Sequence, residues 1–139
     1  MKKRYRGVIF LLLFYPLLLS ANYVHWQGDY NKALQQAHRE NKPLLVLVIK
    51  RDVPLCGEII KKVFMNQPYV KQINRDMIAV IVTYEWRVSY PIELFYTTSF
   101  PSLFLVNSTD ETFLSSPLYE QNISVESLKL LNHLFFMPL

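Results

Sequence analysis

The pattern of apolar and polar residues marks out segments of strand length. Leu44–Ile49 and residues 77–82 are uninterrupted apolar runs, which are typical of strands buried on both faces of a sheet. A third run, Ser102–Val106, is followed by a polar hairpin turn over residues 107–111. We therefore expect a short fourth strand over residues 112–114.

Apolar residues at helical spacing indicate a helix before the first strand and another at the end of the chain. The first covers residues 30–41, with Asp29 as its N-cap and Lys42-Pro43 as its stop. The last starts near Ser124. Its inward-facing positions are expected to be Val125, Leu128, Leu131, Leu134 and Phe135.

The segments between the strands have a less regular pattern. One helix is expected to bury Ile59, Ile60, Val63 and Phe64. The sequence Asn66-Gln67-Pro68 breaks this helix before a further turn that carries Val70 and Ile73. Residues 85–99 are aromatic and show no sustained period, so we expect a loop with a short helix over residues 92–96.

The order of these elements predicts an α/β fold with a central mixed four-stranded sheet and helices on both faces. Leu44–Ile49 and residues 77–82 should be adjacent and parallel, because a helix joins them. The other two strands should continue the sheet in antiparallel pairs. The chain has 139 residues, of which 51% are hydrophobic, enough for one packed domain over residues 22–139.

The N-terminal segment has the layout of a secretory signal peptide over residues 1–21. Four basic residues (Lys2, Lys3, Arg4 and Arg6) precede an apolar run over residues 8–19, and Ser20 and Ala21 follow. As a helix, residues 8–21 would span roughly 21 Å, less than the ~30 Å hydrocarbon core of a bilayer. We therefore predict export, most simply to the periplasm. Cleavage after Ala21 would put Leu19 at the third position before the cut, where a small residue is usual. An uncleaved membrane anchor is therefore the alternative.

The basic charge of the chain is concentrated in this N-terminal segment. The formal net charge is +4, and without the first four basic residues eleven basic residues balance eleven acidic ones. Binding to a phosphate backbone requires a basic surface, so we expect no nucleic-acid partner. Contact with a membrane is expected only if the N-terminal segment stays uncleaved.

Cys56 is the single cysteine of the chain, so an internal disulfide is impossible. The three histidines are dispersed and lack the spacing of a zinc or haem site, so we expect no metal. The three glycines form no Gly-rich run that would hold a nucleotide. We expect no cofactor.

Several short motifs occur in an order that is typical of one protein family. They are Trp26, Asp29-Tyr30, Ala33-Leu34, Ala37, Lys42-Pro43, Cys56, Val63-Phe64, Pro68, Val70 and the segment from Phe100-Pro101 to Leu105. In this order they resemble exported thioredoxin-fold domains of the thiol:disulfide interchange type. The resemblance implies a thioredoxin-like three-layer fold and a cis peptide bond between Phe100 and Pro101.

The resemblance also shows where this chain departs from the family. Two family cysteines flank two residues at the start of the helix after the first strand, and Val63-Phe64 sets the register. Cys56 then matches the second cysteine, and Val53 stands in place of the first, which is the attacking thiolate. The implied substrate groove consists of Val53, Pro54, Leu55, Phe100 and Pro101.

These observations leave several functions open. The leading hypothesis is a binding or accessory protein in periplasmic thiol and protein-folding biology, with an extended peptide or protein in the groove. The alternative is a monothiol protein in which Cys56 exchanges disulfides alone. A purely structural exported domain is a third hypothesis. Cys56 is either a small buried hydrophobe or a reactive thiol, and Pro101 either starts a strand or shapes the groove.

Two tripeptides fit the pattern of a glycan acceptor, Asn107-Ser108-Thr109 and Asn122-Ile123-Ser124. Glu120 precedes Asn122 by two residues and so also fits the longer acidic form used by some bacteria. Asparagine is common at such turns for its local hydrogen bonds, so both the modified and the unmodified side chain remain alternatives.

Overall fold

The computed structural model describes residues 23–65, 67–85 and 89–136. The predicted signal peptide lies outside these residues. In chain order the elements are α2 (Tyr30–Glu40), β1 (Leu44–Ile49), α3 (Pro54–Val63), α4 (Gln67–Asp76), β2 (Ile78–Thr83), β3 (Ser102–Val106), β4 (Leu118–Tyr119), the 3-10 helix η1 (Glu120–Asn122) and α5 (Val125–Phe136). None of the described helices has the length and apolar character needed to cross a bilayer.

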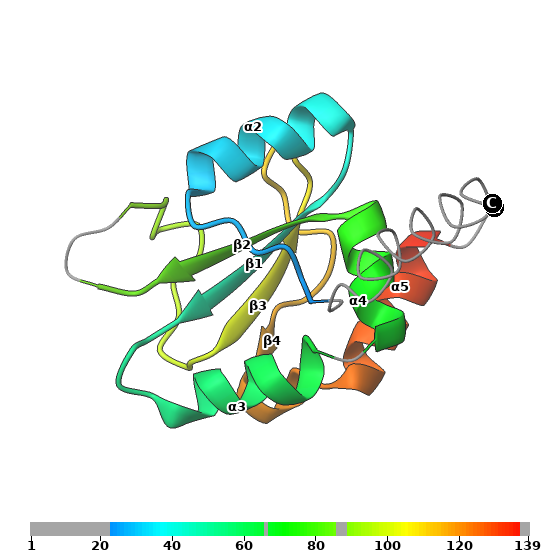
Figure 1. Cartoon of the computed structure of the whole chain (residues 1–139). Coiled ribbons are helices and arrows are strands. Elements are labelled where there is room, and N and C mark those ends of the chain that lie inside the picture. The colour runs from blue at the N-terminus through cyan, green and yellow to red at the C-terminus, as the bar shows by residue number, and fades with distance from the viewer. Residues whose placement is uncertain (1–22, 66, 86–88, 137–139) are drawn as a thin grey trace, which may run out of the picture.

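The four strands form one mixed sheet in the order β2-β1-β3-β4 (Figure 1). β1 and β2 are parallel, with Leu44 opposite Ile78. β3 runs antiparallel to β1, with Val106 opposite Leu44, and β4 pairs antiparallel with β3, with Tyr119 opposite Ser102. The predicted mixed four-stranded sheet is therefore confirmed.

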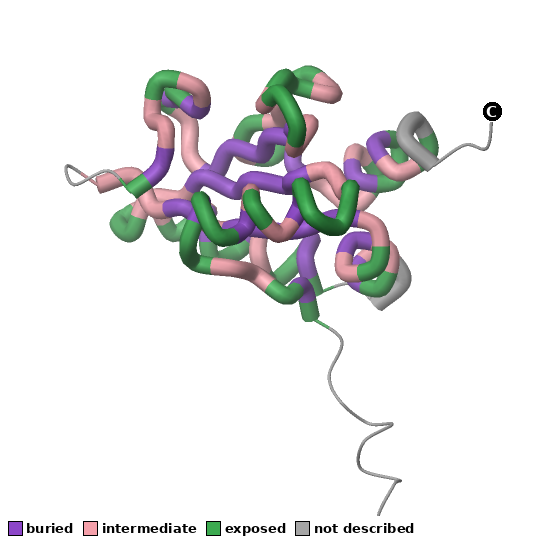
Figure 2. The backbone as a smooth tube through the Cα atoms, turned by 90° about the horizontal axis from the view of Figure 1, so that it is seen from above, coloured by how far each residue is buried: buried purple, intermediate pink, exposed green. Residues whose placement is uncertain are grey.

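Helices cover both faces of the sheet, as predicted (Figure 1). Leu44, Val46 and Val48 of β1 lie in the core that contains α2, whereas Leu45 and Leu47 lie in the core that contains α3, α4 and α5. This alternation explains why β1 reads as an unbroken apolar run: each of its faces lies against a core. Figure 2 shows the buried positions gathered along the strands and the exposed ones on the outer surfaces of the helices.

Local sequence sets both ends of α2. The carboxylate of Asp29 accepts a 3.0 Å hydrogen bond from the backbone N–H of Lys32, as expected for an N-cap. Asn41 ends the helix in the left-handed conformation, with φ of 53°, and its N–H donates to the last carbonyl groups of the helix. Pro43 follows and prevents the helix from continuing.

The segment before α2 is held against β2 and α4. Gln27 forms an isolated parallel bridge with Val80 at the outer edge of β2. The side-chain amide of Asn74 in α4 donates to the carbonyl of Tyr23 and accepts from the N–H of His25, both at 2.9 Å. This segment therefore covers one edge of the sheet.

Three predictions about irregular segments need correction. Residues 112–114 do not form the fourth strand: only Phe113 pairs there, in an isolated bridge with Val106, and the strand is β4. Residues 92–96 form a turn rather than a helix, closed by hydrogen bonds to the carbonyl of Pro91. The turn expected after Pro68 is the full helix α4, because proline is tolerated in the first turn of a helix.

Candidate functional site

The candidate site lies where β1 ends and α3 begins. Val53 is the N-cap of α3, with an extended backbone (φ −109°, ψ 102°), and Pro54 is the first helical residue. A valine side chain has no acceptor for the free N–H groups of the first turn, and no side-chain cap bond forms. The position matched to the first family cysteine is therefore an N-cap, as the resemblance implies.

Cys56 lies one turn deeper, as the third residue of α3. Its side chain belongs to the buried side of the helix with Ile59 and Val63, and the residue is only 4% exposed. Its backbone N–H donates a 3.1 Å hydrogen bond to the carbonyl of Val53. Leu55 is half-buried against the core that contains α3, whereas Pro54 is exposed.

Pro101 comes immediately before β3, and the Phe100-Pro101 peptide bond is cis, the isomer expected from the resemblance. The proline is buried, and its carbonyl accepts a 2.8 Å hydrogen bond from the N–H of Glu120. Glu120 opens η1, which packs against α3. The structure thus connects Pro101 to α3 through η1, which contacts both.

A small polar network holds the loop in front of Pro101. The hydroxyl groups of Thr97 and Ser102 lie 2.8 Å apart, and both residues are buried. The N–H of Ser99 donates to the Thr97 hydroxyl, whose own proton reaches the Ser99 carbonyl at 2.9 Å. This network satisfies the hydroxyl groups of two buried side chains, and no periodicity in the sequence predicts it.

Phe100 lies between groups from two other segments. Its ring centre is 5.3 Å from that of Tyr84, which follows β2, and 5.8 Å from Nζ of Lys50, which follows β1. The carbonyl of Lys50 accepts from the N–H of Val53 at 3.2 Å, so the turn leading into α3 is linked to Phe100 through Lys50. Sequence reasoning missed the roles of Tyr84 and Lys50, because only the folded chain brings them to Phe100.

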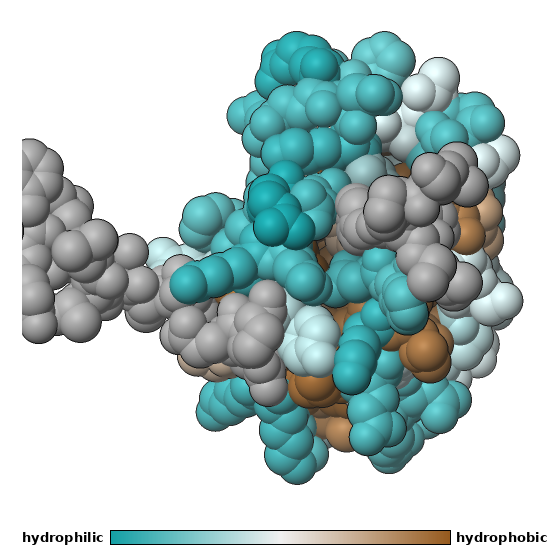
Figure 3. All heavy atoms as spheres, turned by 90° about the vertical axis from the view of Figure 1, so that its right-hand side faces the viewer, coloured by the Kyte–Doolittle hydropathy of each residue, from teal (hydrophilic) through white to brown (hydrophobic). Residues whose placement is uncertain are grey.

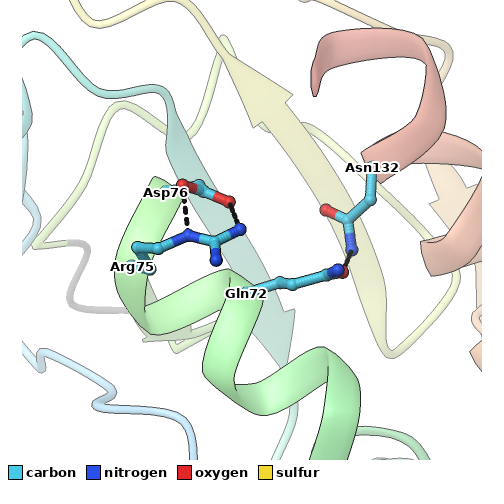
Figure 4. A network of polar contacts seen from close by, with 4 residues as sticks. All are labelled: Gln72, Arg75, Asp76 and Asn132. Carbon is cyan, nitrogen blue, oxygen red and sulfur yellow. Dashed lines mark hydrogen bonds and ion pairs between the residues drawn. The ribbon is translucent and has the colours of Figure 1, made fainter. Parts of the chain in front are cut away.

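A separate open hollow of about 400 Å³ lies between α4 and α5, and it includes none of the expected groove residues. Four of its lining residues form two polar pairs. Asn132 donates a 3.0 Å hydrogen bond to Gln72, and the guanidinium group of Arg75 makes two 2.9 Å contacts with Asp76 (Figure 4). Hydrophilic side chains predominate on this side of the molecule (Figure 3).

The two glycan-acceptor motifs lie in different surroundings. The side-chain oxygen of Asn107 accepts a 2.8 Å hydrogen bond from the N–H of Thr109 within its turn. Asn122 is exposed, but the hydroxyl of Ser124 in the same motif bonds Ser127 at the start of α5. Within the described ranges, no three His, Cys, Asp or Glu residues are grouped so that they could hold a metal ion.

The family described as thioredoxin-like matches residues 25–108, a range that includes Val53, Cys56 and Pro101. The chain belongs to the thioredoxin-like family. No curated protein sequence gives a significant match.

Several solved structures share the thioredoxin-like fold. A DsbH oxidoreductase superimposes with a TM-score of 0.67 at 14% identity, over 86% of this chain and 90% of that one. A thioredoxin from Thermus thermophilus gives 0.65 at 15% identity, over 82% and 88%. The oxidised C-terminal domain of DsbD from Neisseria meningitidis gives 0.56 at 18% identity, over 78% and 97%. At these identities the likeness establishes the fold.

Proposed function

We propose that this protein is an exported thioredoxin-fold protein that binds a partner without catalysing dithiol exchange. The observation that carries the proposal is Val53 at the N-cap of α3, in a chain with one cysteine. A thiolate at a helix N-terminus is stabilised by the free N–H groups and the helix dipole, and this is the group that attacks a disulfide. Valine forms no mixed disulfide.

The burial of Cys56 favours binding over monothiol exchange. Thiol–disulfide exchange requires the attacking sulfur to approach a disulfide sulfur of the partner directly. A residue that is 4% exposed, on the inner side of a helix, leaves little room for that approach. In this proposal Cys56 is a small apolar residue that packs beneath the start of α3.

The proposed binding surface is the groove of Val53, Pro54, Leu55, Phe100 and Pro101. It would take an extended segment of a partner protein. The partner's role in thiol or protein-folding biology is supported by the fold neighbours named as an oxidoreductase and a thioredoxin. Export is supported by the basic N-terminus followed by the apolar run over residues 8–19.

Alkylation of Cys56 tests the proposed function. We expect the thiol of the native protein to react more than about tenfold more slowly with iodoacetamide than the thiol of urea-unfolded protein, because folding buries it. The Cys56→Ala variant gives the background of each measurement. Equal rates in the two states, together with disulfide-linked partners trapped from the exported fraction, would support monothiol exchange instead.

Fractionation of cells that express the full chain tests export. A shortened protein outside the cytoplasm is expected if residues 1–21 are a cleaved signal peptide. A full-length membrane-bound product would identify an uncleaved anchor, and a full-length soluble cytoplasmic product would contradict export.

A further inference from the structure

Three aromatic rings form a row on the face of the sheet that carries α2. Phe104 of β3 is the buried middle member, with Phe113 at 5.4 Å and Tyr119 at 6.5 Å between ring centres. Phe113 is 41% exposed and Tyr119 is 39% exposed. We call these three residues the aromatic row.

Strand pairing places the outer two rings on the same face. Phe113 is opposite Val106 and Tyr119 is opposite Ser102, and both partners lie an even number of positions from Phe104. The two paired positions are four residues apart along β3, or about 13 Å at ~3.3 Å per residue. α2 packs on β1 and β2. The part of this face that α2 covers therefore lies beside the aromatic row.

The part of the sequence that carries Phe113 and Tyr119 is acidic. From residue 89 to residue 128 the chain has no lysine, arginine or histidine, but it has Glu93, Asp110, Glu111, Glu120 and Glu126. Asp110 and Glu111 precede the Phe113 end of the row, and Glu120 directly follows Tyr119. Among the described residues, the ion pairs involve none of these five carboxylates.

We propose that the aromatic row binds an extended, arginine-containing segment of a partner protein. Guanidinium groups stack on aromatic rings and at the same time donate hydrogen bonds to carboxylates, a combination that this surface supplies at both ends. An ammonium group is more strongly hydrated and lacks the planar shape for stacking, so lysine fits less well. An extended segment of about five residues would span the row.

The aromatic row is a different surface from the groove of the proposed function, and the inference does not rest on that function. The two are nevertheless neighbours. The N–H of Glu120 bonds the carbonyl of Pro101, and Tyr119 pairs with Ser102. A partner that lies along the row therefore ends next to Pro101.

Calorimetric titration with short peptides that alternate proline with arginine, lysine or glutamate tests the inference. The Arg-Pro peptide should bind at least about tenfold more tightly than the Glu-Pro peptide, with Lys-Pro between them, and its affinity should fall as salt rises. Phe113→Leu and Tyr119→Leu, which keep apolar volume but remove the ring, should each weaken Arg-Pro binding severalfold. Glu120→Gln should also weaken it, whereas Glu58→Gln on the exposed side of α3 should not.

Two controls keep the outcomes distinct. Thermal unfolding of each variant shows whether the domain is folded. If Phe113→Leu does not fold, peptide binding by Tyr119→Leu decides the test. Equal binding of the Arg-Pro and Glu-Pro peptides, or undiminished Arg-Pro binding by folded Tyr119→Leu, would overturn the inference. Self-association in ultracentrifugation that these variants abolish would overturn it in favour of a second copy of the chain. None of these outcomes changes the alkylation rate of Cys56, which reports on the groove separately.

Discussion

The hydroxyl group of Tyr30 donates a 2.7 Å hydrogen bond to Oε1 of Glu111, 81 residues further along the chain. Tyr30 is buried in the first turn of α2, and Glu111 lies in the turn after β3 with φ of 56°. The bond therefore joins the helix on one face of the sheet to the turn between Phe104 and Phe113 of the aromatic row.

Replacing Tyr30 by phenylalanine should lower the free energy of unfolding by about 1.5–3 kcal/mol, the range for a hydrogen bond to a charged group. Urea denaturation monitored by circular dichroism measures the change. Glu111→Gln keeps a neutral acceptor at the same place and should cost less than Tyr30→Phe. A Tyr30→Phe protein as stable as the native one would show that the bond contributes nothing.

The same pair predicts a loss of stability at high pH. Burial, and then the hydrogen bond to Glu111 and the charge of its carboxylate, raise the pKa of Tyr30 above its ordinary value of 10.0. The folded state therefore holds this proton more tightly than the unfolded state. Its contribution is complete below pH 10 and should be lost progressively as the pH rises above 10. Urea midpoints measured from pH 8 to pH 12 should fall less steeply for Tyr30→Phe than for the native protein.

Tyr90 provides the opposite case. Its hydroxyl is buried and has no hydrogen-bond partner among the described residues. Burial, and then the nearby Tyr84, raise its pKa. Tyr90→Phe removes a buried hydroxyl that has no partner in the described part of the chain, so it should leave the free energy of unfolding unchanged or raise it by about 1 kcal/mol. A loss of stability similar to that of Tyr30→Phe would indicate that the Tyr90 hydroxyl has a hydrogen-bond partner outside the described residues.

Restoring the missing cysteine should give the protein redox activity. Val53→Cys places a thiol at the N-cap of α3, where the helix N-terminus lowers its pKa, and creates the sequence Cys-Pro-Leu-Cys. We expect an internal disulfide after air oxidation, and reduction of insulin with dithiothreitol as the reductant. Val53→Ser is the matched control: it should stabilise the protein by about 1 kcal/mol as a better N-cap, without redox activity. A Val53→Cys protein whose two thiols remain free in air would contradict the assigned register.

Elements with a strong local pattern were predictable to within one or two residues. Leu44–Ile49 and Ser102–Val106 are strands with these bounds, because both are apolar runs buried on two faces. β4 was not predictable in the same way. Leu118–Tyr119 has two residues, and its pairing depends on where the preceding turn delivers the chain rather than on its own pattern.

In the candidate site, too, some positions were predictable from the sequence and others were not. Val53 and Cys56 lie three positions apart at the start of one helix, and their places were predicted from the resemblance, with Val63-Phe64 setting the register. The neighbours of Phe100 come from the segments after β1 and β2. Tyr30 in α2 donates its hydrogen bond to Glu111 in the turn after β3. Such contacts join residues that are distant in sequence, and no local period or motif encodes them.

The two borders of the sheet leave little backbone open to other chains. Gln27 pairs along β2 at one border, and at the other border Pro117 precedes a strand of only two residues. Short or covered borders are how proteins resist aggregation through the joining of sheets. Within the described residues, a second protein that approaches either border of the sheet therefore meets mainly side chains and covered backbone, and has few strand groups with which to pair.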